Sequence, residues 1–283
     1  MFQITAAITT YRREWDCIER AIISIEKQTH SVCELLLVDD NPGGAYSEEI
    51  ARKIARHPSV RVLSDGKNHG VSLARNTAIR EAQGDFIAFL DDDDEWLPDK
   101  IENQIMVLEK HPSAALIFGK GMKETKNGME LTWSSTIFKE HPTYHDMLKM
   151  DHVGSASHPL IRVDVAKELG GFIQMPAVED YEFWIRIAKK YEIWGCDKVL
   201  YTKHMPKGRH VSGNHERTFH GYERIYQENQ SEYDADIEAK IRIYYNMIRR
   251  GVMAKTPEVL PYLAWWFVMR AKYRVTERLN HAQ

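Results

Sequence analysis

The sequence has few cysteines, no cluster of basic residues and little net charge, and each of these features excludes a class of protein. Its three cysteines, Cys17, Cys33 and Cys196, are far apart and form no CxxC pair. This argues against a disulfide framework or a zinc cluster and favours a reducing compartment. The formal net charge is -3, so nucleic acid is not expected as the principal partner.

The sequence also lacks a secretory signal and any apolar run of about eighteen residues, so we expect a cytoplasmic protein without a transmembrane helix. The nearest approach to such a run, residues 259–269, is rich in Trp and is followed by Arg270, Lys272, Arg274 and Arg278. This segment fits peripheral contact with the inner face of the cell membrane. It also fits a terminal helix packed on the domain or in a homodimer, and packing is the favoured interpretation.

Short apolar runs alternate with segments of helical period from residue 2 to about 118, which predicts an α/β fold with a mostly parallel central sheet flanked by helices. The expected strands are residues 4–9, 35–38, 60–63, 86–90 and 114–118. The expected helices are residues 14–27, 46–56 and 71–82, and a further helix with Ile101, Ile105 and Leu108 on its apolar face.

The remaining chain is less regular and then becomes helical. Residues 119–200 predict an α+β half with a short strand at 161–163, a short helix at 165–169 and a helix at 181–190. Residues 219–283 predict helices that are rich in aromatic side chains. We therefore expect a domain over 1–215, with halves at about 1–118 and about 119–215, followed by a helical C-terminal extension over 216–283.

Four consecutive carboxylates, Asp91 to Asp94, directly follow the apolar stretch 86–90. Adjacent carboxylates repel one another and lose hydration near a core, so this arrangement is unfavourable unless a cation or hydrogen-bond donors offset the charge. Mg²⁺ and Mn²⁺ prefer oxygen ligands and commonly link one or two carboxylates to substrate phosphates. The acidic run therefore predicts a metal-assisted phosphate site.

Two other interpretations of the acidic run compete with this one. Asp94 and Glu95 could simply cap a helix that starts near Pro98. A calcium-binding EF-hand loop would place acids at a similar spacing, but Trp96 stands where that loop requires Gly, so this interpretation fails.

Polar side chains follow three other predicted strands. Residues 9–12 follow the first strand, Asp39 and Asp40 follow the second, and Asp65 with residues 68–75 follows the third. Ligands of open α/β sheets bind beyond the carboxyl ends of the strands, so we expect these groups and the acidic run to share one crevice. Hydroxyl, aromatic, carboxylate and guanidinium groups together suit a base, a ribose and a diphosphate.

Five segments carry a family resemblance through their order and spacing. They are Thr9-Thr10-Tyr11-Arg12, Val38-Asp39-Asp40-Asn41, residues 68–76, Phe89-Leu90 with the acidic run, and Glu179-Asp180. In these segments the chain resembles the inverting GT-A glycosyltransferases of family 2, which use nucleotide-sugar donors. The resemblance covers about residues 2–215 and implies the Rossmann-like GT-A fold.

The resemblance also implies roles on the nucleotide side. Thr9 and Tyr11 resemble the contacts that hold a uracil base, Asp39 the carboxylate that accepts the uracil N3 hydrogen, and Arg75 the basic residue that reaches the nucleotide. Judged on the residues alone, Tyr11 could merely pack, Asp39 could cap a turn and Arg75 could form a plain salt bridge. Asp40 is expected to accept backbone amides in its own turn.

The acidic run resembles the DXD motif of the family, which implies Mn²⁺ or Mg²⁺ as cofactor. Asp93 would be the direct metal ligand, and Asp91 or Asp92 would touch the ribose or a metal-bound water. His204 resembles a histidine that approaches the diphosphate or the metal, although lone histidines are more often packed or surface residues.

Glu179 and Asp180 resemble the catalytic acid pair, with Asp180 as the general base that deprotonates an acceptor hydroxyl. The alternative is an Asp that caps a helix. Residues 206–214 contain Lys207, Arg209 and His210 and could close over the diphosphate. Residues 151–158 are expected to line the acceptor side.

The resemblance therefore implies a metal-dependent inverting glycosyltransferase that moves a sugar from a UDP-sugar to a hydroxyl of a glycan or lipid-linked acceptor in surface polysaccharide biosynthesis. A sugar nucleotidyltransferase is one rival, but the glycine-rich loop of those enzymes is absent after the first predicted strand. The other rival is a nucleotide-sugar or glycan-binding module without turnover.

Overall fold

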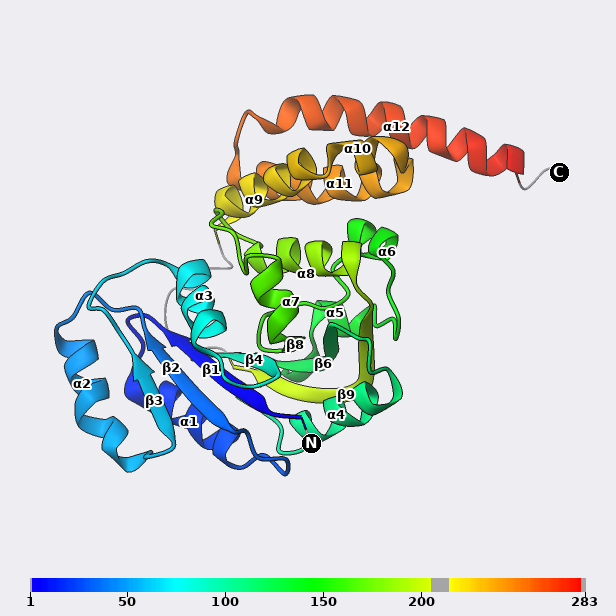
Figure 1. Cartoon of the computed structure of the whole chain (residues 1–283). Coiled ribbons are helices and arrows are strands. Elements are labelled where there is room, and N and C mark those ends of the chain that lie inside the picture. The colour runs from blue at the N-terminus through cyan, green and yellow to red at the C-terminus, as the bar shows by residue number, and fades with distance from the viewer. Residues whose placement is uncertain (1, 205–213, 281–283) are drawn as a thin grey trace.

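A mixed β-sheet forms the centre of the structure, a computed structural model that describes residues 2–204 and 214–280 (Figure 1). Its strands are β1 (Ile4–Thr10), β2 (Glu34–Asp39), β3 (Val60–Leu63), β4 (Phe86–Asp91), β5 (Asp94–Trp96), β6 (Leu116–Thr125), β7 (Gly128–Leu131), β8 (Leu160–Arg162) and β9 (Ile193–Lys203). They lie in the order β3-β2-β1-β4-β8-β6-β9-β5, and β7 pairs with β6.

The first four strands of this order are parallel, as the alternation of apolar runs and helical segments predicts. The helices of this half are α1 (Trp15–Glu26), α2 (Ala45–Lys53) with a 3-10 turn at Ile54–Arg56, α3 (Val71–Glu81) and α4 (Lys100–Lys110). Successive strand residues point to opposite faces. Ile8 therefore joins a core with α1 and α4, and Ala7 joins a second core with α3. Helices thus cover both faces of the sheet.

The second half is mixed, as expected for an α+β segment. Strand β8 is antiparallel to β4 and β6, and β5 is antiparallel to β9, whereas β6 and β9 are parallel. The strand expected at 114–118 is the start of the longer β6, and the sequence pattern does not predict β5, β7 or β9.

A Cβ atom on Gly121 would lie 2.0 Å from the Tyr201 ring. Glycine therefore allows β6 and β9 to pair closely, although glycine is a weak strand signal in a sequence.

The second half also contains short helices and one longer helix. They are α5 (Trp133–Thr136), α6 (Tyr144–Lys149), α7 (Val163–Glu168) and α8 (Glu179–Lys190). Helix α8 confirms the helix predicted at 181–190, whereas α5 and α6 were not predicted because each is short.

The chain ends in four helices, as predicted: α9 (His215–Glu228), α10 (Gln230–Ala235), α11 (Ile237–Ala254) and α12 (Val259–Asn280), with side chains described as far as Arg270. Aromatic rings join them, since the ring centroid of Tyr244 lies 5.2 Å from those of Tyr226 and Tyr262. Figure 1 shows α12 on the side of α11 away from the sheet. In the described part of the chain, no helix is both long and apolar enough to cross a membrane.

Candidate active site

The carboxyl ends of β1, β2 and β4 lie side by side. In the register of the sheet, Thr9 stands between Val38 of β2 and Asp91 of β4, and Thr10 stands beside Asp39. Because adjacent strands are about 4.8 Å apart, the polar residues that follow these strands meet at one edge. The predicted convergence is therefore present in the fold.

Arg75 connects two groups of carboxylates at this edge. Its side chain is buried, and its guanidinium lies 2.9 Å from Asp91 Oδ1 through Nη2 and 3.0 Å from Glu179 Oε1 through Nη1. Burial by itself would raise the pKa of Asp91, but the charges of Arg75 and Lys203 outweigh it and the pKa lies below its ordinary value. The guanidinium also lies 5.2 Å from the ring centroid of Phe172.

Arg13 binds the middle of the acidic run. Its Nε lies 2.9 Å from Asp92 Oδ1 and its Nη2 lies 2.9 Å from Asp93 Oδ2, while the Thr10 hydroxyl donates to Asp92 at 2.8 Å. Burial raises the pKa of Asp92 to about 6, with the charge of Asp93 adding to the rise and Arg13 opposing it. Neither Arg13 nor Thr10 was predicted as a site residue, although both belong to or adjoin the segment after the first strand.

Asp94 does not cap a helix, so that interpretation was wrong. Helix α4 starts at Lys100 with Asp99 as the preceding residue, and Asp94 lies in β5, buried, where the Ser157 hydroxyl donates to it at 2.7 Å. Burial raises the pKa of Asp94 to about 8, and the negative charge of Asp91 adds to this effect.

Lys203, at the end of β9, is the main cation facing this part of the acidic run. Asp94 stands opposite Lys203 in the pairing of β5 with β9. Burial would lower the pKa of Lys203, but the charges of Asp94, Asp91 and Asp93 outweigh it and raise the pKa above its ordinary value. In the sequence, Tyr201 and Lys203 are two positions apart, which is the spacing of residues on one face of a strand. The sequence pattern does not predict β9, so Lys203 was not predicted as a site residue.

The acidic run has a partial set of oxygen ligands for a metal. Among residues 2–204 and 214–280, no three Asp, Glu, His or Cys side chains lie close enough together to hold a metal ion by themselves. Asp94 Oδ1, however, is buried without a hydrogen-bond partner, and the negative charges of Asp91 and Asp93 act on this carboxyl group. The cluster fits Mg²⁺ or Mn²⁺ when a diphosphate and water supply the other ligands.

His204 lies beside two carboxylates rather than beside the centre of the acidic run. Its Nε2 is 3.0 Å from Glu95 Oε2, and its Nδ1 is 3.5 Å from Glu124 Oε2. Binding a metal would require one of these contacts to open. The loop predicted to close over the diphosphate, apart from its last residue, lies outside the described residues.

Two aspartates at the end of β2 have different hydrogen-bond partners. Asp39 is buried and accepts from the backbone and side-chain nitrogens of Asn41. Asp40 has a structural role, but the amides that it accepts belong to His69 and Gly70 rather than to its own turn. It therefore joins the end of β2 to the loop before α3.

A cavity of about 590 Å³ opens beside the ends of β2 and β3 and the adjoining side of α3. Its lining includes Asp39, Leu63 and Leu73. Tyr11 is 43% exposed after the end of β1, and the Arg12 guanidinium lies 5.1 Å from its ring centroid.

Glu179 and Asp180 form the start of α8, whereas the sequence predicts a helix that begins only after them, at residue 181. The residue before them is strained. Val178 has a φ of 58°, a conformation that β-branched residues rarely adopt and that clusters at functional sites. Burial raises the pKa of Asp180 to about 8, and the negative charges of Glu179 and Asp151 add to the rise. Asp151, in the segment expected on the acceptor side, has a pKa raised to about 6 by burial.

Helix α9 holds the loop that leads to this turn. Arg217 donates to the carbonyl of Pro176 at 2.9 Å, and the Arg224 guanidinium donates to the carbonyl of Gln174 at 2.5 Å. A Cβ atom on Gly221 would lie 2.4 Å from the carbonyl oxygen of Ala177. The helical extension thus packs directly on the loop beside Asp180, a contact that the sequence did not predict.

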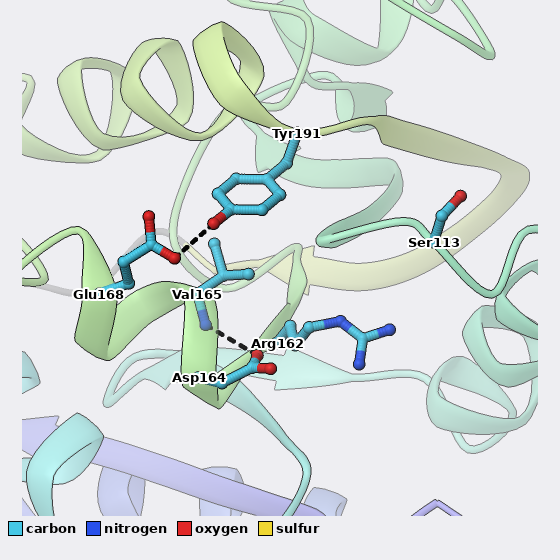
Figure 2. Close-up of a pocket in the computed structure, with 6 residues that line it drawn as sticks. All are labelled: Ser113, Arg162, Asp164, Val165, Glu168 and Tyr191. Carbon is cyan, nitrogen blue, oxygen red and sulfur yellow. Dashed lines mark hydrogen bonds between the residues drawn. The ribbon is translucent and has the colours of Figure 1, made fainter.

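Figure 2 shows a second cavity, of about 270 Å³, between Arg162, Glu168 and Tyr191. Arg162 pairs with Phe86 at the start of β4, so this cavity lies at the opposite end of that strand from the acidic run. It is not part of the candidate active site.

Comparison with known proteins identifies the family. The family model described as Glycosyl transferase family 2 matches residues 5–170. The Escherichia coli UDP-Glc:alpha-D-GlcNAc-diphosphoundecaprenol beta-1,3-glucosyltransferase WfgD is 30% identical over 194 residues, which cover 68% of this chain and 72% of WfgD. The amylovoran biosynthesis glycosyltransferase AmsE of Erwinia amylovora is 25% identical over 181 residues, 64% of this chain and 67% of AmsE.

Solved structures agree with the fold. Residues 1–349 of S. aureus TarS, in complex with UDP-GlcNAc, align with a TM-score of 0.68 and 20% identity over 94% of this chain and 79% of that one. The mannosyltransferase PcManGT from Pyrobaculum calidifontis, in complex with GDP-Man and Mn²⁺, aligns with a TM-score of 0.62 and 15% identity over 95% and 84%. The expected GT-A fold is confirmed, and the chain belongs to glycosyl transferase family 2 and is a glycosyltransferase.

Proposed function

We propose that this glycosyltransferase is metal-dependent and inverting, and that it moves a sugar from a UDP-sugar to a hydroxyl of a glycan or lipid-linked acceptor in surface polysaccharide biosynthesis. The domain division near residue 215 and a cytoplasmic location stay predictions. The observation that carries the proposal is the arrangement of Asp91, Arg75 and Glu179, since one buried guanidinium joins the acidic run, where the phosphates would bind, to the carboxylate pair of α8.

The nucleotide half of the proposal rests on the ends of β1 and β2. Thr9 and Tyr11 would contact the uracil, and Asp39 would accept its N3 hydrogen beside the cavity of about 590 Å³. Arg75 and Asp91, with Asp92, would fix the ribose and the sugar. In support, the TarS neighbour is in complex with UDP-GlcNAc, and the relative WfgD is named as a UDP-Glc glucosyltransferase.

The acid-base half rests on Asp180. In its ionised form the carboxylate would remove the proton of the acceptor hydroxyl while that oxygen forms a bond to the anomeric carbon. The bond between that carbon and the diphosphate oxygen breaks, and its electron pair leaves with the diphosphate, so the configuration inverts. Glu179, held by Arg75, would fix the turn that carries Asp180.

The departing diphosphate needs positive charge. Lys203 and Arg13 lie beside the acidic run and would interact with the phosphates as charge develops. A bound Mn²⁺ or Mg²⁺, held by Asp93 with Asp91 or Asp94, would supply further electrostatic stabilisation of the leaving group. His204 as a ligand stays a prediction.

A donor panel tests the proposal. The purified protein is incubated with UDP-, GDP- and TDP-sugars with and without Mn²⁺, and released nucleoside diphosphate is measured. We expect metal-dependent release of UDP from one UDP-sugar. Binding of UDP-sugars without release under any condition, or release of pyrophosphate from a sugar phosphate and UTP, would instead support the binding module or the nucleotidyltransferase.

A further inference from the structure

The solvent side of α12 is apolar, whereas the solvent side of a surface helix is ordinarily polar. Trp265 is 58% exposed and Phe267 is 61% exposed. They belong to one continuous side of the helix, here named the α12 apolar face, whose residues are Leu260, Pro261, Ala264, Trp265, Phe267 and Val268. The opposite side of the helix packs inward through Val259, Tyr262, Trp266 and Met269.

Exposed apolar residues of α11 lie close to this helix. The ring centroid of Tyr245 is 6.3 Å from that of Trp266, and Tyr245 is itself 49% exposed. Val252 and Met253, in the last turn of α11, are 57% and 52% exposed. Single exposed apolar residues are normal, but a contiguous set marks an interaction surface. Leu260, Trp265, Phe267 and Val268 form such a set on one side of α12, and within the described residues the fold leaves it exposed.

The surroundings of the α12 apolar face are basic. Residues 237–270, whose side chains the structure describes, contain six Lys or Arg and two Asp or Glu, although the whole chain has a formal net charge of -3. Among the described side chains, Arg249 and Lys255 are exposed before the face and Arg270 is exposed after it. The partner of this surface should therefore be both apolar and negatively charged.

We propose that the α12 apolar face binds in the interface of an anionic lipid membrane, with the helix lying in the membrane plane. Trp265 and Phe267 would enter the boundary between headgroups and acyl chains, and Arg249, Lys255 and Arg270 would meet the anionic headgroups. A twofold contact with a second copy is disfavoured, because it would bring the basic ends of the two faces together.

Membrane binding through this face would orient the active site. Helix α9, in the same helical extension as α12, holds the loop of Gln174 to Val178 beside Asp180. The acceptor half would then be held at a fixed orientation to the bilayer, as a lipid-linked acceptor requires. The membrane contact itself does not depend on the transfer chemistry, so the two proposals can fail separately.

Vesicle flotation tests the proposal. The full chain is mixed with vesicles of phosphatidylcholine alone or with phosphatidylglycerol added, and the bound fraction is measured over a range of NaCl concentrations. We expect binding to the anionic vesicles that weakens with salt. The double variant Trp265→Glu, Phe267→Glu should bind at least about tenfold more weakly. Met106→Glu, which changes an equally exposed residue of α4 (52%), should bind like the wild type.

Several outcomes would overturn the proposal. Flotation that is absent, or equal in the wild type and the double variant, excludes the face as a membrane contact. A wild-type dimer by light scattering that becomes a monomer in the double variant, without vesicle binding by either, would assign the face to a second copy. If the double variant fails to fold, the milder variant Trp265→Ser takes its place in the flotation test. Donor hydrolysis in solution shows whether each variant is folded, and it tests the proposal for catalysis separately.

Discussion

Arg75 and Glu179 are 104 positions apart in the sequence, yet Arg75 Nη1 lies 3.0 Å from Glu179 Oε1. The same guanidinium donates to Asp91, so a single buried cation joins the acidic run to the first turn of α8. The distance between the proposed phosphate site and the proposed base is therefore fixed by one side chain from a third element, α3.

Replacing Arg75 should affect stability as well as activity. Arg75→Met removes the buried cation that Asp91 and Glu179 both bind, so we expect the free energy of unfolding to fall by about 3–5 kcal/mol in urea denaturation. Arg75→Lys keeps the charge but cannot hold both carboxylates in the same planar geometry. We expect it to lose activity more than stability.

The matched control is Arg80→Met on the same helix. Arg80 is exposed and lies 3.7 Å from Glu81, and exposed pairs contribute little, so its effect should stay within about 0.5 kcal/mol. Equal losses in Arg75→Met and Arg80→Met would show that the buried bridge has no special role.

The transfer rate should depend on the ionisation of Asp180. Its pKa is raised to about 8, and only the carboxylate can act as a base, so kcat/KM should rise with pH through about 8 and then level off. Glu179→Gln removes a negative neighbour, so the rising limb should move to lower pH. Asp180→Asn should lower kcat by a factor on the order of 10² to 10⁴ while circular dichroism shows an intact fold. Near-normal turnover of Asp180→Asn would exclude it as the base.

Metal binding should depend on Asp93. We expect a chelator to abolish transfer and added Mn²⁺ to restore it, and calorimetry should show UDP and Mn²⁺ binding together. Asp93→Ala should weaken Mn²⁺ binding in this titration, and His204→Ala is expected to weaken it as well.

Glu130→Ala, an exposed acid of β7, is the control for a general loss of negative charge and should bind Mn²⁺ normally. Full activity in the presence of the chelator would refute metal dependence. If His204→Ala binds Mn²⁺ with unchanged affinity, His204 is not a metal ligand, and its contact with Glu95 is structural.

The contact between α9 and the loop before α8 should matter for catalysis. Gly221→Val adds a Cβ atom that would lie 2.4 Å from the Ala177 carbonyl oxygen, so the loop must move. Because displacement of a positioned group by a small distance lowers the rate strongly, we expect kcat to fall at least about tenfold with little change in the KM for the donor.

Arg217→Ala should also lower kcat, but by a smaller factor, since it removes only the hydrogen bond to the Pro176 carbonyl. Glu216→Ala, an exposed neighbour in the same turn, should leave kcat unchanged. If Gly221→Val instead raises the donor KM and preserves kcat, the loop does not position the base.

Much of the first half could be predicted because its information is local. Strands β1, β2 and β4 are buried on both faces and read as continuous apolar runs, and their polar successors must then meet at one edge. In the second half, fewer helices and strands could be predicted from the sequence. Strand β9 contains Gly195, Asp197 and Lys198, which are weak strand formers, and its pairing with β6 and β5 makes it a strand.

The sequence by itself determined the parallel half-sheet, the acidic run at its edge and the family, because each is written in consecutive residues or in their spacing. Only the tertiary structure decided that Arg13 and Lys203 face the acidic run, that Arg75 bridges to Glu179 and that α9 supports the loop before Asp180. The physical reason is that these are contacts between distant segments, whose partners are selected by packing and charge in three dimensions and leave no periodic signal along the chain.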